Sequence, residues 1–242
     1  MKKQRSKRIV FAFLAIVIVW QIAAMIKDNE LLIPYPYQVV TAMLKQVRTY
    51  GFYKAVLATL YRTLVGLGIS FICALGSAYA CFRYKIINDL CYPFLLLTRS
   101  IPNISYILIV LVLFSRAHAV LVILFLILFP IMHAHLYEGF QSMDQALLDV
   151  LKLYPPNPIF HFLHVYLPLL KPVIKASLTS GISLAFKVGV MAEILGGMQN
   201  GIGRELNLCR LNFDMISMFA WTIWMIFLLV LMDRILSFIF RE

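Results

Sequence analysis

LATLYRTLVGLGISFICALGSAYAC, residues 57–81, is a long apolar run with a single charged side chain, that of Arg62. The hydrocarbon core of a bilayer is about 30 Å thick, and an α-helix needs roughly 20 mostly apolar residues to cross it. Residues 57–81 meet this requirement. Comparable runs on both sides predict six membrane spans: about 9–26, 57–81, 91–114, 118–137, 173–195 and 217–239.

The composition also indicates a membrane protein. Of the 242 residues, 62% are apolar and 14% are charged, whereas soluble domains carry about 25% charged residues. A soluble fold of this size could not cover so much apolar surface with polar side chains. We therefore expect an all-α fold, a polytopic transmembrane bundle of about six helices, with residues 1–242 forming a single transmembrane domain.

The net charge of +11 does not indicate a nucleic-acid-binding protein. Such proteins gather their basic residues on one surface, whereas here these residues are spread between the apolar runs. The positive-inside rule places the N-terminus in the cytoplasm, because five basic residues precede the first run: Lys2, Lys3, Arg5, Lys7 and Arg8. Six crossings return the C-terminus to the cytoplasm. The sequence thus predicts a multi-pass protein in contact with lipid and not with nucleic acid.

The first run is expected to stay in the membrane as an anchor helix. Residues 9–26 exceed the 7–15-residue apolar core of a signal peptide. A second helix is expected in the external segment 27–56, where Pro36 stands at a favoured first-turn position. Apolar residues with helical spacing follow it: Val40, Met43, Leu44 and Val47. Such a helix is expected to lie on the outer membrane surface or against the bundle, or to be a simple connector between spans.

A cytoplasmic loop over residues 139–172 is expected between the fourth and fifth spans. Ser142 and Gln145 have the spacing of a capping box, which predicts that a helix begins at Ser142. Pro155 and Pro156 end this helix. Asn157 and the proline after it begin a second helix, which the later Leu-Pro pair at 167–168 closes. A helix pair this short is marginal alone in water, so we expect it to pack on the bundle, on a partner, or on both.

Polar or helix-breaking residues within the expected spans are candidates for a translocation pathway: Arg99, Pro102, Asn103, Lys187 and Glu193. A charge at the bilayer centre costs about 2.5–3.5 kcal/mol on insertion scales. Backbone groups freed by a proline must face protein or water. Lys187 and Glu193 are six residues apart, so one helix does not align them. A snorkelling or internally paired lysine, a glutamate near water and a kinked packing helix remain the alternatives.

The sequence contains no P-loop, GxSxG or HExxH motif. The cysteines lack metal or redox spacing. His133 and His135 point in different directions on a helix, and the pair at 161 and 164 shares a face without a third ligand. We therefore predict no catalytic residue, no metal site and no cofactor in this chain.

The loop resembles the cytoplasmic EAA loop of binding-protein-dependent ABC importer permeases. Counting back from Leu167-Pro168 aligns Asp149 with the acidic residue of that pattern and Pro155 with its glycine. A proline there fixes φ and makes the turn stiffer. Other parts of the chain are similar to the nitrate/sulfonate/taurine-type group, in order and spacing: Ile33-Pro34-Tyr35-Pro36, Thr59-Leu60-Tyr61-Arg62, Arg99-Ser100-Ile101-Pro102, Gly139, Phe186-Lys187-Val188-Gly189, Ala192-Glu193 and Gly201-x-Gly203.

This resemblance implies a transmembrane permease subunit in a bacterial-type cell membrane. The implied partners are a second permease copy, two cytoplasmic ATPase subunits and an external substrate-binding protein. The second permease copy makes a homodimer the expected assembly. The ATPase subunits are expected to bind ATP and Mg. The family uses the loop to dock in a groove of the ATPase. The docking residues in this chain are expected to be Asp149, Lys152, Leu153, Tyr154, Pro155 and Asn157.

Two other classes of function remain open from the sequence. An intramembrane enzyme would use His133, His135 and Glu138, although these residues include no recognisable nucleophile or ligand set. An ion channel or membrane scaffold would need no ATPase partner, so the coupling loop argues against it. The transported solute is not readable from this chain, and sulfonates, nitrate, pyrimidine vitamin precursors and flavins all remain candidates.

Overall fold

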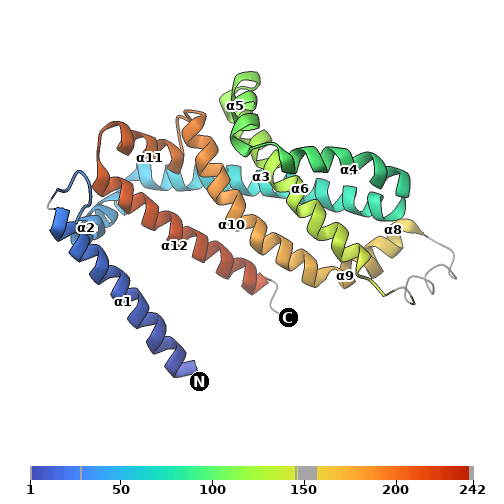
Figure 1. Ribbon diagram of the computed structural model, residues 1–242, viewed down its shortest axis with the longest axis horizontal. Helices are drawn as coiled ribbons and strands as arrows, with labels where there is room; N and C mark the ends of the chain where they lie inside the picture. Colours follow the sequence, from blue (N-terminus) through green and yellow to red (C-terminus); the bar gives the residue numbers. More distant parts are fainter. Residues whose placement is uncertain (1, 28, 145, 147–156, 240–242) are drawn as a thin grey trace. The chain divides into compact units, whose positions relative to one another are not determined.

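The structure is a computed structural model that describes residues 2–27, 29–144, 146 and 157–239 (Figure 1). This part of the chain is helical and contains no strand. It forms two compact units, one made of Met1–Ala58 with Gln199–Leu228 and the other of Thr59–Met198 with Leu229–Glu242. Two long helices, α3 (Tyr50–Arg83) and α12 (Met215–Ile239), contribute residues to both units.

The first unit contains α1 (Lys2–Lys27), α2 (Pro36–Val47) and α11 (Ile202–Leu211), with the adjoining turns of α3 and α12. The helix expected in the external segment is α2. Pro36 occupies its first turn, where a missing N–H costs nothing, and the Tyr35 N–H donates to Gln38 Oε1 at 2.9 Å. Trp20 Nε1 donates to the Pro34 carbonyl at 3.0 Å, which fixes α1 against the start of α2.

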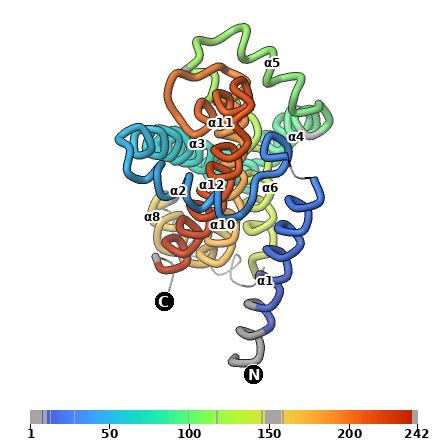
Figure 2. Tube along the Cα trace, turned by 90° about the vertical axis from the view of Figure 1, so that its left-hand side faces the viewer, coloured from blue at the N-terminus to red at the C-terminus, as the bar shows by residue number. Residues whose placement is uncertain are grey.

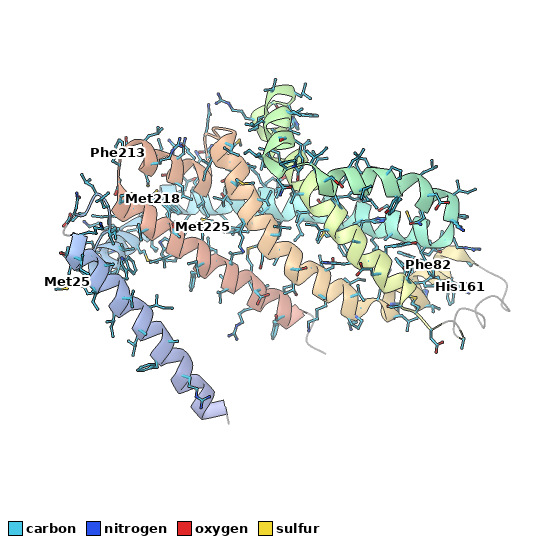
Figure 3. All side chains as sticks on the ribbon, viewed as in Figure 1. Met25, Phe82, His161, Phe213, Met218 and Met225 are labelled. Carbon is cyan, nitrogen blue, oxygen red and sulfur yellow. The ribbon has the colours of Figure 1, made fainter. Side chains whose placement is uncertain are left out.

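The sequence analysis did not predict α11 or the tight turn that follows it. Phe213 in this turn has φ of +54°, a left-handed conformation that is uncommon for a residue with a side chain. Asp214 Oδ1 then accepts the Ser217 N–H at 2.9 Å and caps the start of α12. Figure 3 labels Phe213 and Met218 beside this turn, and Met225 farther along α12. The turn brings α11 next to α12 within the first unit.

The second unit is built around α6 (Arg116–Gln141) and α10 (Lys171–Leu195), which pack against each other (Figures 1 and 2). The remainder of α3 packs on them through small residues. A Cβ atom at Gly66 would lie 2.9 Å from Leu124 Cβ and 2.6 Å from Leu124 Cδ1. Only glycine at position 66 therefore allows α3 and α6 to approach this closely. The buried core of the unit is mostly apolar, and it also contains buried polar side chains, among them His133 and Glu193.

The described residues include four helices long and apolar enough to cross a membrane: Tyr50–Arg83, His118–Gln141, Lys171–Leu195 and Met215–Phe238. The expected first span, 9–26, lies within α1, but the described apolar part of this helix, Leu14–Lys27, is shorter than a membrane span. The chain is thus an all-α, multi-pass membrane protein, as the apolar runs predicted.

The span expected over 91–114 is interrupted at Pro102, as its helix-breaking proline indicated. The chain forms α4 (Lys85–Ser100) and α5 (Asn103–Leu113), bent by 96° at the break between them, and the pair counts as a fifth span only if both helices are taken together. Pro102 causes the break, because it lacks an N–H and pushes the residue before it out of the helical region. Ile101 accordingly has extended angles, φ −79° and ψ 129°.

Candidate coupling and translocation site

Most of the predicted ATPase-docking residues lie outside the described residues: Asp149, Lys152, Leu153, Tyr154 and Pro155. Asn157 is described, and its side chain is exposed. Its Oδ1 accepts the Phe160 N–H at 3.3 Å, and its carbonyl accepts the His161 N–H at 3.0 Å. Asn157 therefore caps the second helix of the loop, as the sequence predicted.

The first half of the loop begins differently from the capping-box prediction. Ser142 ends α6: its N–H donates to the Glu138 carbonyl at 3.0 Å and its hydroxyl to the Gly139 carbonyl at 3.0 Å. Asp144 is the residue whose Oδ1 accepts the Ala146 N–H, at 2.9 Å. The expectation for Ser142 was wrong, because α6 continues to Gln141 and uses this serine for its own last carbonyls.

The second helix of the loop does not close at Leu167-Pro168. It starts as α8 (Pro158–His161), widens into a π-helical turn, η1 (Phe162–Tyr166), and continues through α9 (Leu167–Leu169). Pro168 sits in the first turn of α9, where no N–H is required. The Leu170 N–H donates to the Tyr166 carbonyl at 2.9 Å, immediately before α10 begins. The loop therefore runs into α10 through a π turn, a feature often found at functional sites.

Five aromatic side chains from three elements surround this π turn: Tyr79, Phe82, Phe140, Phe162 and Tyr166. We call them the aromatic cluster. The rings of Tyr79 and Phe162 are 4.7 Å apart, and Phe140 is fully buried. Figure 3 shows Phe82, on α3, and His161, on α8, at the same end of the second unit. The cluster thus holds the loop against α3 and α6.

The sequence analysis missed the aromatic cluster. Its members come in helix-spaced pairs, at i, i+3 on α3 and i, i+4 on η1, and this spacing was a signal that could have found them. Gly139 completes the attachment. A Cβ at this position would lie 2.8 Å from Val173 Cγ1 and 3.0 Å from Leu170 Cδ2. The absence of a side chain lets the end of α6 approach the start of α10 closely.

Glu193, predicted to line a pathway, has partners inside the second unit. Its side chain is 1% exposed, and its Oε1 accepts Arg62 Nη1 at 2.6 Å. Its Oε2 accepts the Thr59 hydroxyl at 2.8 Å. These contacts join α10 to α3 by charge-assisted hydrogen bonds, the strong kind. Arg62 stood out in the sequence as the single charge of its apolar run and as part of a family-like motif, but its pairing with Glu193 was not predicted.

Lys187 lies on a different side of α10 from Glu193. Its side chain is exposed, whereas those of Phe186 and Val188 on either side are buried. Six residues rotate the helix by one full turn and about 240°. The two side chains therefore point about 120° apart and cannot share a face. The lysine therefore points away from the packed side of α10 and is open to a partner chain, lipid or water.

The other predicted pathway residues lie at the break between α4 and α5. Pro102 and Asn103 are exposed. Asn103 Oδ1 accepts the Tyr106 hydroxyl at 2.6 Å, which stabilises the first turn of α5. The backbone of Arg99 belongs to α4, and its side chain lies outside the described part of the chain. The structure therefore leaves the predicted role of these residues in a pathway as a prediction.

The residues of the enzyme alternative do not meet. His133 is buried, with its Nδ1 2.8 Å from the Ser77 hydroxyl, whereas His135 and Glu138 are exposed. Within the described ranges, no three His, Cys, Asp or Glu side chains lie close enough together to hold a metal ion. His135 and Glu138 are thus separated by burial from the Ser77–His133 contact, and the described residues give the enzyme alternative no support.

Comparison with known proteins identifies the family. Residues 66–242 match the sequence model of a family described as the binding-protein-dependent transport system inner membrane component. A probable ABC transporter permease protein of Brucella melitensis is 25% identical over 183 residues, which are 75% of this chain and 74% of that protein. One of Haemophilus influenzae is 27% identical over 164 residues, 67% of this chain and 66% of that protein. The chain therefore belongs to the family of binding-protein-dependent transport system inner membrane components, and it is a transmembrane permease subunit of an ABC transporter.

Proposed function

We propose that this permease belongs to an importer of the nitrate/sulfonate/taurine-type group. The support is the order of short motifs that resemble that group, from Ile33-Pro34 to Gly201-x-Gly203. In this proposal the N- and C-termini are cytoplasmic, and a separate binding protein delivers the solute to the external side. The chain sits in a bacterial-type cell membrane.

The coupling proposal rests on one observation, the attachment of the loop to the bundle. The aromatic cluster holds the π turn against α3 and α6, and α9 leads directly into α10. A force applied to the loop would therefore reach α10 through helical backbone. We assign the docking surface to Asp149, Lys152, Leu153, Tyr154, Pro155 and Asn157. ATP and Mg bind to the partner ATPases, whose closure moves the loop and swings the pathway between its two faces.

Two copies of this chain form the pathway. ATPase subunits of this family work in pairs, and each needs a loop to dock against. Lys187 lies on an unpacked side of α10, and a lipid-exposed charge is costly, so a second copy covers this side in the proposed assembly. Mass measurement of the purified complex checks this point. A single permease chain per complex would contradict it.

Photo-crosslinking tests the docking surface directly. Benzoylphenylalanine placed at position 157, which is exposed at the start of α8, should crosslink to the ATPase in membranes. The matched control places it at position 50, where Tyr50 is also exposed but begins α3. A crosslink from position 157 alone supports the proposal. Equal crosslinking from both positions, or from neither, would contradict it.

A further inference from the structure

A cavity of about 660 Å³ opens within the first unit, between α2, the start of α3, α11 and the start of α12. Sites for small molecules have volumes of about 300–1,000 Å³. Neither the coupling loop nor the predicted pathway residues contribute to it. Six lining residues carry a charge, a buried polar atom or an aromatic ring: Lys45, Gln46, Phe52, Glu205, Asp214 and Trp221.

The lining of the cavity is charged. Lys45 of α2, Glu205 of α11 and Asp214 before α12 all belong to the lining, so it carries both signs of charge. Glu205 Oε1 accepts Arg204 Nη1 at 2.6 Å, and Asp214 Oδ1 accepts a backbone N–H. Within the described ranges, the second oxygen of each carboxylate is left for another donor. Burial and the charges of Asp214 and Glu205 raise the pKa of the adjoining Cys209 thiol to about 11.

The remaining lining supplies an aromatic surface and an unused acceptor. Phe52 and Trp221 are buried and stack with ring centroids 5.4 Å apart at an interplanar angle of 22°. Gln46 Oε1 is buried, and no donor reaches it from the described part of the chain. An unsatisfied buried acceptor costs about 1–3 kcal/mol.

We infer that this cavity binds a small zwitterionic solute that carries an ammonium group and a carboxylate. The carboxylate pairs with Lys45, and the ammonium group faces Asp214 and Glu205. The apolar part of the solute lies on the rings of Phe52 and Trp221. This goes beyond the proposed function, because it assigns solute recognition to the permease chain itself and involves neither the ATPase nor the docking loop.

The test uses the full-length chain in lipid nanodiscs and a panel of zwitterions: glycine, L-alanine, L-leucine and L-phenylalanine. Calorimetry and tryptophan fluorescence should detect saturable binding of at least one member. The N-acetyl form of that member loses the ammonium group, its amide loses the carboxylate, and its trimethylated betaine loses the N–H donors. Each should bind at least about tenfold more weakly, since one charge-assisted hydrogen bond contributes about 1.5–3 kcal/mol.

Two variants and one control distinguish the contributions of the basic and acidic lining residues to binding. Lys45→Gln should weaken the zwitterion at least about tenfold and leave the weaker binding of the amide unchanged. Asp214→Asn should weaken both, while its remaining oxygen still caps Ser217. Lys54→Gln removes an exposed positive charge of the same unit that does not line the cavity, and should bind as wild type.

Three results would overturn the inference: no saturable binding of any panel member, equal binding of the zwitterion and its blocked forms, or unchanged affinity in both variants. If Lys45→Gln weakened only the binding of the external binding protein, the cavity would belong to that protein interface and the inference would fail. None of these measurements depends on ATP hydrolysis. A failure of the cavity inference is therefore distinguishable from a failure of the proposed function.

Discussion

Arg62 and Glu193, which are 131 residues apart in the sequence, form an ion pair of 2.6 Å that joins α3 to α10. Glu193 is almost fully buried, and Arg62 keeps 18% of its side chain exposed. A charge left alone in such a place is costly even when the intact pair contributes little. The pair therefore makes the separation of these two helices unfavourable.

Removing one member of the pair should destabilise the chain more than removing both. Glu193→Gln leaves Arg62 without its charge partner, and we expect a loss of unfolding free energy at the low end of about 3–5 kcal/mol because Arg62 is partly exposed. The double variant Arg62→Gln/Glu193→Gln should be more stable than the sum of the single losses predicts. The free energy of unfolding is measured in mixed detergent micelles for the wild type, the two single variants and the double variant. Additive losses would contradict the coupling.

The packing of α3 on α6 predicts opposite effects for two glycines of the same helix. Gly66→Ala places a Cβ 2.9 Å from Leu124 Cβ, which cannot swing away, and should cost about 1–3 kcal/mol. Gly76→Ala meets nothing within 4 Å and should be neutral or stabilise the helix by up to about 1 kcal/mol. Thermal unfolding in detergent compares the two. Equal effects would show that the helices do not approach as closely as described.

Cys209 should be a slow thiol whose reactivity depends on its acidic neighbours. Burial, Asp214 and Glu205 raise its pKa to about 11, so the thiolate is scarce at pH 8. Asp214→Asn removes a negative charge, lowers the pKa and should speed alkylation. The raised pKa also contributes stability that is complete below the ordinary pKa of about 9 and lost as the pH rises towards 11.

Alkylation by iodoacetamide, followed by mass spectrometry in a variant lacking the other three cysteines, measures this rate. The logarithm of the rate should rise with pH up to about 11 in the wild-type site. A plateau near pH 9, or an unchanged rate in Asp214→Asn, would contradict the influence of the carboxylates.

Tyr154 is expected to anchor the loop in the ATPase. Aromatic residues often dominate the binding energy of an interface, and Tyr154→Ala should cost roughly 2 kcal/mol or more of binding. It should also uncouple ATP hydrolysis from uptake without unfolding the membrane helices. Pull-down of the ATPase and solute-stimulated hydrolysis in proteoliposomes are the measurements. Wild-type yield together with normal stimulation would refute the anchor, and Tyr154→Phe serves as the matched control.

Lys187→Ala should lower transport while leaving the assembly intact, because the lysine is exposed on α10 and is predicted to face the pathway. Lys187→Arg retains the charge and should keep more activity than the alanine variant. Uptake into proteoliposomes, normalised to the amount of assembled complex, compares them. Wild-type uptake by Lys187→Ala would instead assign this side chain to snorkelling at the membrane surface.

The amino-acid sequence alone determined the fold class and the positions of most helices. Apolar runs must be buried in lipid, and a helix satisfies its backbone hydrogen bonds within itself, so length and hydropathy were sufficient for α3, α6, α10 and α12. Local rules also placed α2 behind Pro36 and the cap at Asn157, because a first-turn proline and an Asn cap act on the next few residues only.

Tertiary structure decided which distant residues meet. The ion pair of Glu193 with Arg62, the aromatic cluster and the cavity beside Lys45 join elements that are far apart in the chain. No local spacing encodes these contacts, since they depend on how helices pack through positions such as Gly66. At 91–114 the sequence indicated a break at Pro102, because a proline cannot continue the helix, but the tertiary structure decided that the helix axis turns there by 96°.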